Sequence, residues 1–181
     1  MPKVTDNHKI LEIHGVKKYF PITTGVFSKV SGYVKAVDDV SFHINEGDTL
    51  GLVGESGCGK TTLGRVITRL YQPTAGQILF RLGKPGSEMT DIAQLDRDEL
   101  LPFRCEMQII FQNPYLSLNP RKTILQIVGE PLIVNKIAQG KELEDRVAQL
   151  LRLVGLRPGH MMRYPHAFSG GQRQRIGIAR A

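Results

Sequence analysis

Residues 54–61 have the types and the spacing that can hold a triphosphate. They read GESGCGKT and match the pattern GxxxxGK[ST] without a mismatch. Glycines permit positive φ angles and a close backbone approach, so several N–H groups can surround the phosphate oxygens. Lys60 offers a positive charge to the β- and γ-phosphates, and the hydroxyl of Thr61 is a ligand for Mg²⁺. The alternative, an ordinary glycine-rich turn, is disfavoured because four fixed positions rarely coincide by chance in a chain of this length.

A second run, near the end of the chain, allows two explanations. Ser169 is followed by two glycines and then by Gln172, in a stretch that reads FSGGQRQRIGIARA. Ser and Gln at this spacing form the capping box of a helix that would begin at Gly170. Two glycines in the first turn cost about 1 kcal/mol each relative to alanine, so a pure cap does not need them. A site that presents bare N–H groups to an anion does need them.

The phosphate loop must lie between a strand and a helix to be functional. Thr49–Val53 is a short apolar run and predicts a buried parallel strand. Residues 60–71 predict a helix, which a proline and a glycine then end. Gln77–Phe80 predicts another short strand, and Glu106–Phe111 a second buried one.

Alternating apolar residues predict two strands before the loop, Ile10–Val16 and Val34–Ile44. One proline, two serines and two glycines between residues 21 and 32 predict a loop that joins these strands. Residues 45–48 predict a turn, and residues 83–101 predict a loop with a short helix.

Two helices are predicted in the last third of the chain, over 123–134 and 142–154. In the second helix the apolar residues recur at helical spacing and share one face. They are Leu143, Val147, Leu150, Leu151 and Val154. We expect this face to pack in the hydrophobic core; the alternative is that it docks a partner.

Composition and charge exclude several classes of protein. The chain has 181 residues, enough for one domain with a core, and its apolar runs are far shorter than the roughly 20 residues of a membrane span. Its start does not resemble a secretory signal, and two cysteines cannot form a disulfide framework. We therefore expect the protein to reside in a reducing cytosol. The net charge of +7 lies entirely in residues 121–181. This charge suits nucleic acid, acidic lipid, an acidic partner or simply a solvated basic face.

The motifs together resemble those of a known family. SGGQ, about 110 residues after the phosphate loop, resembles the signature motif of ABC-type ATPases, and Gln112 after the strand MQIIF resembles their Q-loop glutamine. The segments KKYFP, VKAVDDVSF, LGLVGESGCGKTTLGR, QIIFQNP, SLNPR, EPL and YPHAFSGGQRQRIGIARA look like the ATP-binding subunit of oligopeptide and dipeptide ABC importers. This likeness covers about residues 10–181.

The resemblance implies an α/β fold of the P-loop NTPase, ABC type. An N-terminal antiparallel β subdomain, an incomplete RecA-like core and an α-helical subdomain are expected. Their expected ranges are about 9–50, 48–112 and 113–168, with the signature helix at 169–181. The stretch 113–163 is expected to dock on membrane subunits.

The resemblance also assigns roles to particular residues. Gly54, Glu55, Ser56, Gly57, Cys58, Gly59, Lys60, Thr61 and Thr62 would hold the phosphates and Mg²⁺ of ATP. Gln112 would contact the Mg²⁺ or the attacking water. The candidate catalytic residues are therefore Lys60, in the phosphate loop, and Gln112. The candidate metal ligands are Thr61 and Gln112. Phe20, or next Tyr19, would stack on adenine, against the alternative of an aromatic packed on a strand.

The signature residues would act in a second subunit's site. Ser169, Gly170, Gly171 and Gln172 would reach the γ-phosphate of ATP held by another subunit, so each ATP would lie in a head-to-tail dimer. The other implied partners are membrane permease subunits and, indirectly, a substrate-binding protein, at the cytoplasmic side of a bacterial inner membrane.

One expected part of the catalytic core has no match in the sequence. The family places a strand of apolar residues ending in Asp, then a catalytic Glu, after the signature helix. Ala36-Val37-Asp38-Asp39 is too short an apolar run and precedes the phosphate loop, and His160 and His166 precede the signature. We therefore expect an incomplete form that binds ATP weakly at best and does not hydrolyse it alone. A soluble ABC ATPase acting on nucleic acid or the ribosome, and a non-functional remnant, are the alternatives.

Overall fold

The computed structural model describes residues 8–25, 29–83, 86–111 and 117–181. The chain divides into two compact units, Met1–Met107 and Gln108–Ala181, and each is described separately. No helix in the described ranges is both long and apolar enough to cross a membrane. The subdomain boundaries expected from the resemblance stay a prediction.

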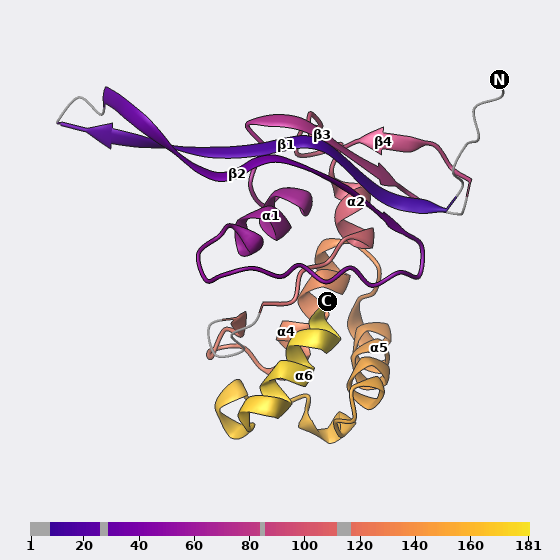
Figure 1. The fold of residues 1–181 in the computed structure, drawn as a ribbon. Coiled ribbons are helices and arrows are strands. Elements are labelled where there is room, and N and C mark those ends of the chain that lie inside the picture. The colour runs from indigo at the N-terminus through magenta and orange to yellow at the C-terminus, as the bar shows by residue number, and fades with distance from the viewer. Residues whose placement is uncertain (1–7, 26–28, 84–85, 112–116) are drawn as a thin grey trace. The chain divides into compact units, whose positions relative to one another are not determined.

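The first unit is built on a four-stranded antiparallel sheet with the order β2-β1-β3-β4 (Figure 1). The strands are β1 (Lys9–Thr24), β2 (Lys29–Asn45), β3 (Ala75–Arg81) and β4 (Met89–Asp91). The three strands predicted from residues 10–16, 34–44 and 77–80 are confirmed, whereas β4 lies in a stretch predicted to be loop and short helix. The alternating apolar residues of β1 meet those of β3, as in the pair Ile13 and Ile78.

The prediction of a loop between residues 21 and 32 is wrong over most of that range. β1 and β2 stay paired through Pro21 and Tyr33 as far as Thr24 and Lys29. Proline interrupts a central strand because it has no N–H, but at Pro21 β1 has only one neighbouring strand, so the residue is tolerated. The result is a long hairpin that runs out past the rest of the sheet (Figure 1).

The core of the first unit is formed by apolar residues of the sheet, of helix α1 (Lys60–Ile67), of helix α2 (Leu101–Glu106) and of the segment before α2. α1 buries Leu63 and Val66 and ends four residues earlier than predicted. The buried members of this core are Leu11, Ile13, Val16, Val37, Leu63, Val66, Ile78, Phe80, Ile92, Ala93, Leu100 and Phe103.

The two predicted parallel strands are not formed. Thr49–Val53 is irregular, and Val53 has 93% of its surface exposed. Residues 107–111 follow α2 and form no strand, and Ile110 is 53% exposed. A parallel strand is stable only between neighbouring strands and under covering helices, and no strand among the described residues pairs with either segment.

The second unit is helical. It contains α4 (Ile124–Val134), α5 (Gly140–Leu153), α6 (Gly170–Arg180) and the short 3₁₀ helices η1 (Pro158–His160) and η2 (Pro165–Ala167). The predicted core face of α5 is confirmed: Val147 and Leu151 are fully buried, while Leu153, on another face, is 82% exposed. These residues pack with Ile124 and Ile176 of the neighbouring helices.

The start of α4 gives a prediction for stability. The Gln126 N–H donates to Thr123 Oγ1 at 3.3 Å, and the Thr123 N–H donates to Gln126 Oε1 at 2.9 Å. Thr123→Ala removes the first bond, so the free energy of unfolding, measured by urea denaturation, is expected to fall by about 1 kcal/mol. Thr123→Ser keeps the hydroxyl and is the matched control. An equal loss in both variants would show that the cap contributes nothing.

Candidate nucleotide-binding site

Residues 54–59 form a loop directly in front of α1, as the motif predicts. Gly59, the residue before the helix, has φ 99°, and the N–H of Leu63 donates to its carbonyl at 2.8 Å. A Cβ at Gly59 would lie 2.1 Å from the carbonyl oxygen of Ala36 on β2. Glycine is therefore required here by the fold of the unit as well as by any ligand.

The N-terminus of α1 carries backbone donors that the helix itself does not use. The first intrahelical bond is made by Leu63, and no side chain caps the helix. The N–H groups of Lys60, Thr61 and Thr62 therefore have no partner within the helix. Such groups, at the positive end of the helix dipole, bind anions such as phosphate.

Lys60 supplies a cation at the same place. Its Nζ donates to the carbonyl oxygen of Gly54 at 2.8 Å and also to that of Glu55, and it lies 3.5 Å from Cys58 Sγ. Lys60 pairs with no carboxylate in the described part of the chain. Because neutral carbonyls bind an ammonium more weakly than phosphate oxygens do, an anion entering the loop can take their place. This donor set fits a triphosphate.

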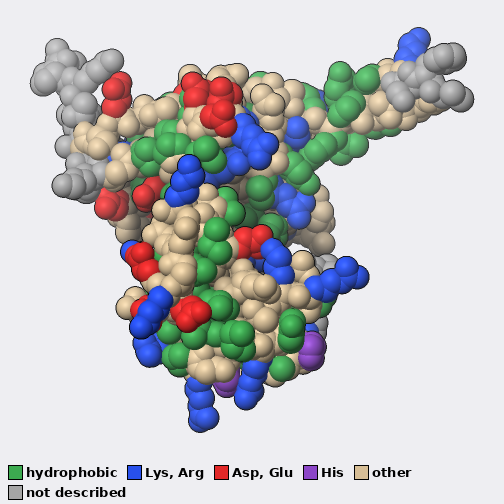
Figure 2. All heavy atoms as spheres, turned by 180° about the vertical axis from the view of Figure 1, so that it is seen from behind, with side chains coloured by type: hydrophobic (Ala, Val, Ile, Leu, Met, Phe, Trp, Pro, Cys, Tyr) green, Lys and Arg blue, Asp and Glu red, His purple; other side chains and the backbone are tan. Residues whose placement is uncertain are grey.

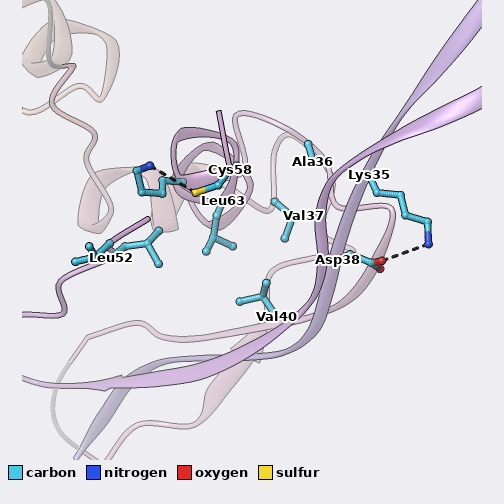
Figure 3. Close-up of a pocket in the computed structure, with 11 residues that line it drawn as sticks. Lys35, Ala36, Val37, Asp38, Val40, Leu52, Cys58 and Leu63 are labelled. Atoms are coloured by element: carbon cyan, nitrogen blue, oxygen red, sulfur yellow. Dashed lines mark hydrogen bonds and ion pairs between the residues drawn. The ribbon is translucent and has the colours of Figure 1, made fainter. Parts of the chain in front are cut away.

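A cavity of about 360 Å³ adjoins the loop. It is lined by β2, by the irregular segment before the loop and by the start of α1 (Figure 3). Val37, Val40 and Leu63 point toward one another, whereas Lys35 and Asp38 point away from them and pair with each other (Figure 3). The cavity beside Cys58 and Lys60 is therefore lined by apolar and polar groups together.

The candidate adenine-stacking residues lie on β1 and are not among the residues that line this cavity. Phe20 packs edge-to-face on Tyr71, with ring centroids 5.7 Å apart, and Lys18 Nζ lies 5.0 Å from its centroid. Its present contacts are those of a packed strand aromatic, and stacking on adenine stays a prediction.

Tyr19 belongs to a polar cluster on the hairpin. Its hydroxyl donates to Asp38 Oδ1, and Lys35 Nζ lies 3.3 Å from Asp38 Oδ2. The hydrogen bond from Tyr19, with help from Lys35, holds the pKa of Asp38 below its ordinary value. The same carboxylate raises the pKa of Tyr19 and that of Lys35.

The predicted capping box at the start of α6 is confirmed. The Ser169 N–H donates to Gln172 Oε1 at 3.0 Å, and the Gln172 N–H donates to Ser169 Oγ at 3.3 Å. A hydroxyl that accepts one bond can still donate its own proton, so Ser169 remains able to bind an anion.

Gly171 distinguishes the two explanations of this run. A Cβ at Gly171 would meet no atom within 4 Å, and its φ does not lie in the left-handed region. The unit's own packing therefore does not require glycine at this position. This favours the explanation in which a ligand approaches the backbone there.

The structure places the candidate residues in two groups. Gly54–Thr62 lie at the N-terminus of α1 in the first unit, and Ser169–Gln172 lie at the N-terminus of α6 in the second. Gln112 lies outside the described residues. His160 packs on Phe168 with centroids 5.5 Å apart, and His166 stacks on Tyr164. Sequence reasoning missed the part played by Ala36, because no local pattern signals the approach of its carbonyl to Gly59.

Comparisons with known proteins identify the family. The profile described as "ABC transporter" matches residues 37–181. The chain is 53% identical over 173 residues to the oligopeptide transport ATP-binding protein AppF of Bacillus subtilis, covering 95% of this chain and 50% of the relative. It is 46% identical over 178 residues to the dipeptide transport ATP-binding protein DppF of Haemophilus influenzae, covering 98% of this chain and 52% of the relative. The chain thus spans about half the length of these curated relatives.

A solved structure shows the same fold. The dimeric ATP-binding cassette MJ0796, in a post-hydrolysis state bound to ADP and Pi, matches with a TM-score of 0.73 at 30% identity. The match covers 94% of this chain and 68% of that one. The expected α/β fold of ABC type and the expected similarity to peptide-transport ATP-binding proteins are both confirmed. The chain belongs to the ABC transporter family.

Proposed function

We propose that this chain is part of the ATP-binding subunit of an ABC importer for peptides or similar small solutes. The observation that carries the proposal is the uncapped N-terminus of α1 beside Lys60, whose ammonium has no carboxylate partner among the described residues. The names of the relatives, which are oligopeptide and dipeptide transport ATP-binding proteins, support the importer class.

The proposed ligand is ATP with Mg²⁺. The free N–H groups at residues 60–62 and the ammonium of Lys60 would bind the phosphates, and the exposed hydroxyl of Thr61 would be a metal ligand. In this proposal Gln112 is the further metal ligand, and Phe20 stacks on the base.

The proposed site is completed by a second ABC ATP-binding subunit, which can be identical or different. The free hydroxyl proton of Ser169 and the N–H groups of Gly170 and Gly171 would contact the γ-phosphate of ATP held by that subunit. Membrane permease subunits would bind residues 113–163, at the cytoplasmic side of a bacterial inner membrane, and a substrate-binding protein would act through them.

The two cysteines allow a direct test of ATP binding. Both are free and exposed, Cys58 inside the phosphate loop and Cys105 on α2. At an ATP concentration about ten times Kd, roughly one chain in ten is unliganded, so maleimide labelling of Cys58 is expected to slow about tenfold. Labelling of Cys105, followed in the same sample by mass spectrometry of peptides, is expected to be unchanged.

Adenosine with Mg²⁺ is the matched control for this labelling, because it lacks the phosphates that the loop would bind. It should leave Cys58 as reactive as in the free chain. Equal labelling of Cys58 with and without ATP would contradict the proposal, as would an equal slowing at both cysteines, which reports a general change of the fold.

A further inference from the structure

The outer part of the β1–β2 hairpin has no other strand beside it. β3 pairs with β1 no further than Lys17 and Ala75, whereas β1 and β2 continue together to Thr24 and Lys29. We call residues 18–24 and 29–37 the hairpin arm. Figure 1 shows the arm extending beyond the other strands of the first unit. A two-stranded ribbon alone is at best marginally stable in water, so its side chains should reveal what it packs against.

The arm exposes apolar side chains on both of its faces. Residues directly opposite each other in an antiparallel pair share a face. The pairs Phe20–Val34 and Ile22–Gly32 lie on one face, and the pair Pro21–Tyr33 lies on the other. Exposed hydrophobic side chains occur on each face and next to a β-bulge: Ile22 at 45%, Val30 at 47%, Tyr33 at 60% and Val34 at 53%. An ordinary surface hairpin would have one polar face.

The charges of the arm are all positive. Between Glu12 and Asp38 the sequence has four lysines and no aspartate or glutamate. Lys18 stands over the ring of Phe20, and Lys29 forms no ion pair with any residue that the structure describes. Lys35 stands over the ring of Tyr19 and pairs with Asp38, just beyond the arm, so Lys18 and Lys29 supply the charge that a partner can use. Figure 2 shows hydrophobic side chains along the arm, a basic one near its end, and no acidic one on the visible face.

We propose that the hairpin arm binds the surface of an anionic lipid bilayer. Apolar side chains insert among the headgroups while lysine ammonium groups contact lipid phosphates. A groove on a protein partner would cover one face of the ribbon. A lipid interface surrounds an inserted ribbon on both faces, and its negative charge matches the lysines. This binding does not depend on ATP.

A single tryptophan tests the proposal. The chain has no tryptophan, so the Tyr33→Trp variant of the full chain has one emitting indole, at a position that is 60% exposed. Its emission is expected to shift to shorter wavelength with vesicles of phosphatidylglycerol and phosphatidylethanolamine, and to stay unchanged with phosphatidylcholine vesicles. The matched control is Tyr164→Trp in the second unit, where Tyr164 is 44% exposed, and it should show no shift with either.

Charge reversal gives a second measurement. Vesicle binding of the double variant Lys18→Glu with Lys29→Glu, measured by co-sedimentation, is expected to fall at least about tenfold. The control is Lys136→Glu with Lys141→Glu, in the second unit. No shift in the Tyr33→Trp emission with anionic vesicles would overturn the proposal, and so would equal shifts with both lipids. A shift that follows protein concentration without lipid would also overturn it and assign the arm to a second copy of the chain.

Discussion

Lys60→Ala is expected to weaken ATP binding by about 10- to 100-fold while the chain stays folded. A hydrogen bond to a charged group contributes about 1.5–3 kcal/mol, and each 1.4 kcal/mol is about tenfold in affinity. Among the described residues the ammonium bonds only within its own exposed loop, to the carbonyls of Gly54 and Glu55 and to Cys58 Sγ, so its removal leaves the core intact. Titration of a fluorescent ATP analogue measures the affinity, and circular dichroism checks the fold.

Lys141→Ala is the matched control for this experiment, because Lys141 is an exposed lysine on α5, in the other unit. It removes the same charge from the chain without touching the phosphate loop. Equal affinity in Lys60→Ala and the unchanged chain would contradict the proposed site. Equal losses in both variants would indicate that net charge, not the loop, attracts the nucleotide.

Gly171→Ala is expected to abolish ATP-dependent pairing of two chains without lowering stability. Its Cβ would meet no atom within 4 Å, and replacing glycine by alanine in a helix is favourable by up to about 1 kcal/mol. In the proposed dimer the same methyl group would hold the γ-phosphate away from the backbone N–H groups. Sedimentation velocity with and without Mg²⁺-ATP measures pairing, and thermal unfolding measures stability.

Gly177→Ala, on the same helix, is the matched control. Its Cβ also meets no atom within 4 Å, but the residue lies two turns from the helix N-terminus. It should pair as the unchanged chain does. A lower melting temperature in Gly171→Ala would show that the glycine is required by the fold. A similar loss of pairing in Gly177→Ala would show that the loss does not come from a blocked contact with the γ-phosphate.

Local patterns predicted the elements whose hydrogen bonds are made between near neighbours in the chain. The start of α1 at Lys60, the capping box at Ser169 and the core face of α5 all depend on residues within a few turns of one another. The strands predicted at residues 49–53 and 106–111 failed because a strand needs distant partners, which no local run contains. The hairpin through Pro21 was missed for the related reason that pairing with β2 outweighed the turn residues.

The sequence by itself determined the family and predicted the phosphate loop and the signature run, since each motif is a contiguous set of residue types. Only the tertiary structure decided whether the fold itself requires glycine at two of these positions. At Gly59 the carbonyl of Ala36, on a distant strand, leaves no room for a Cβ, whereas at Gly171 the space is open. The difference depends on which backbone atoms approach from elsewhere in the fold, and no spacing along the chain records it.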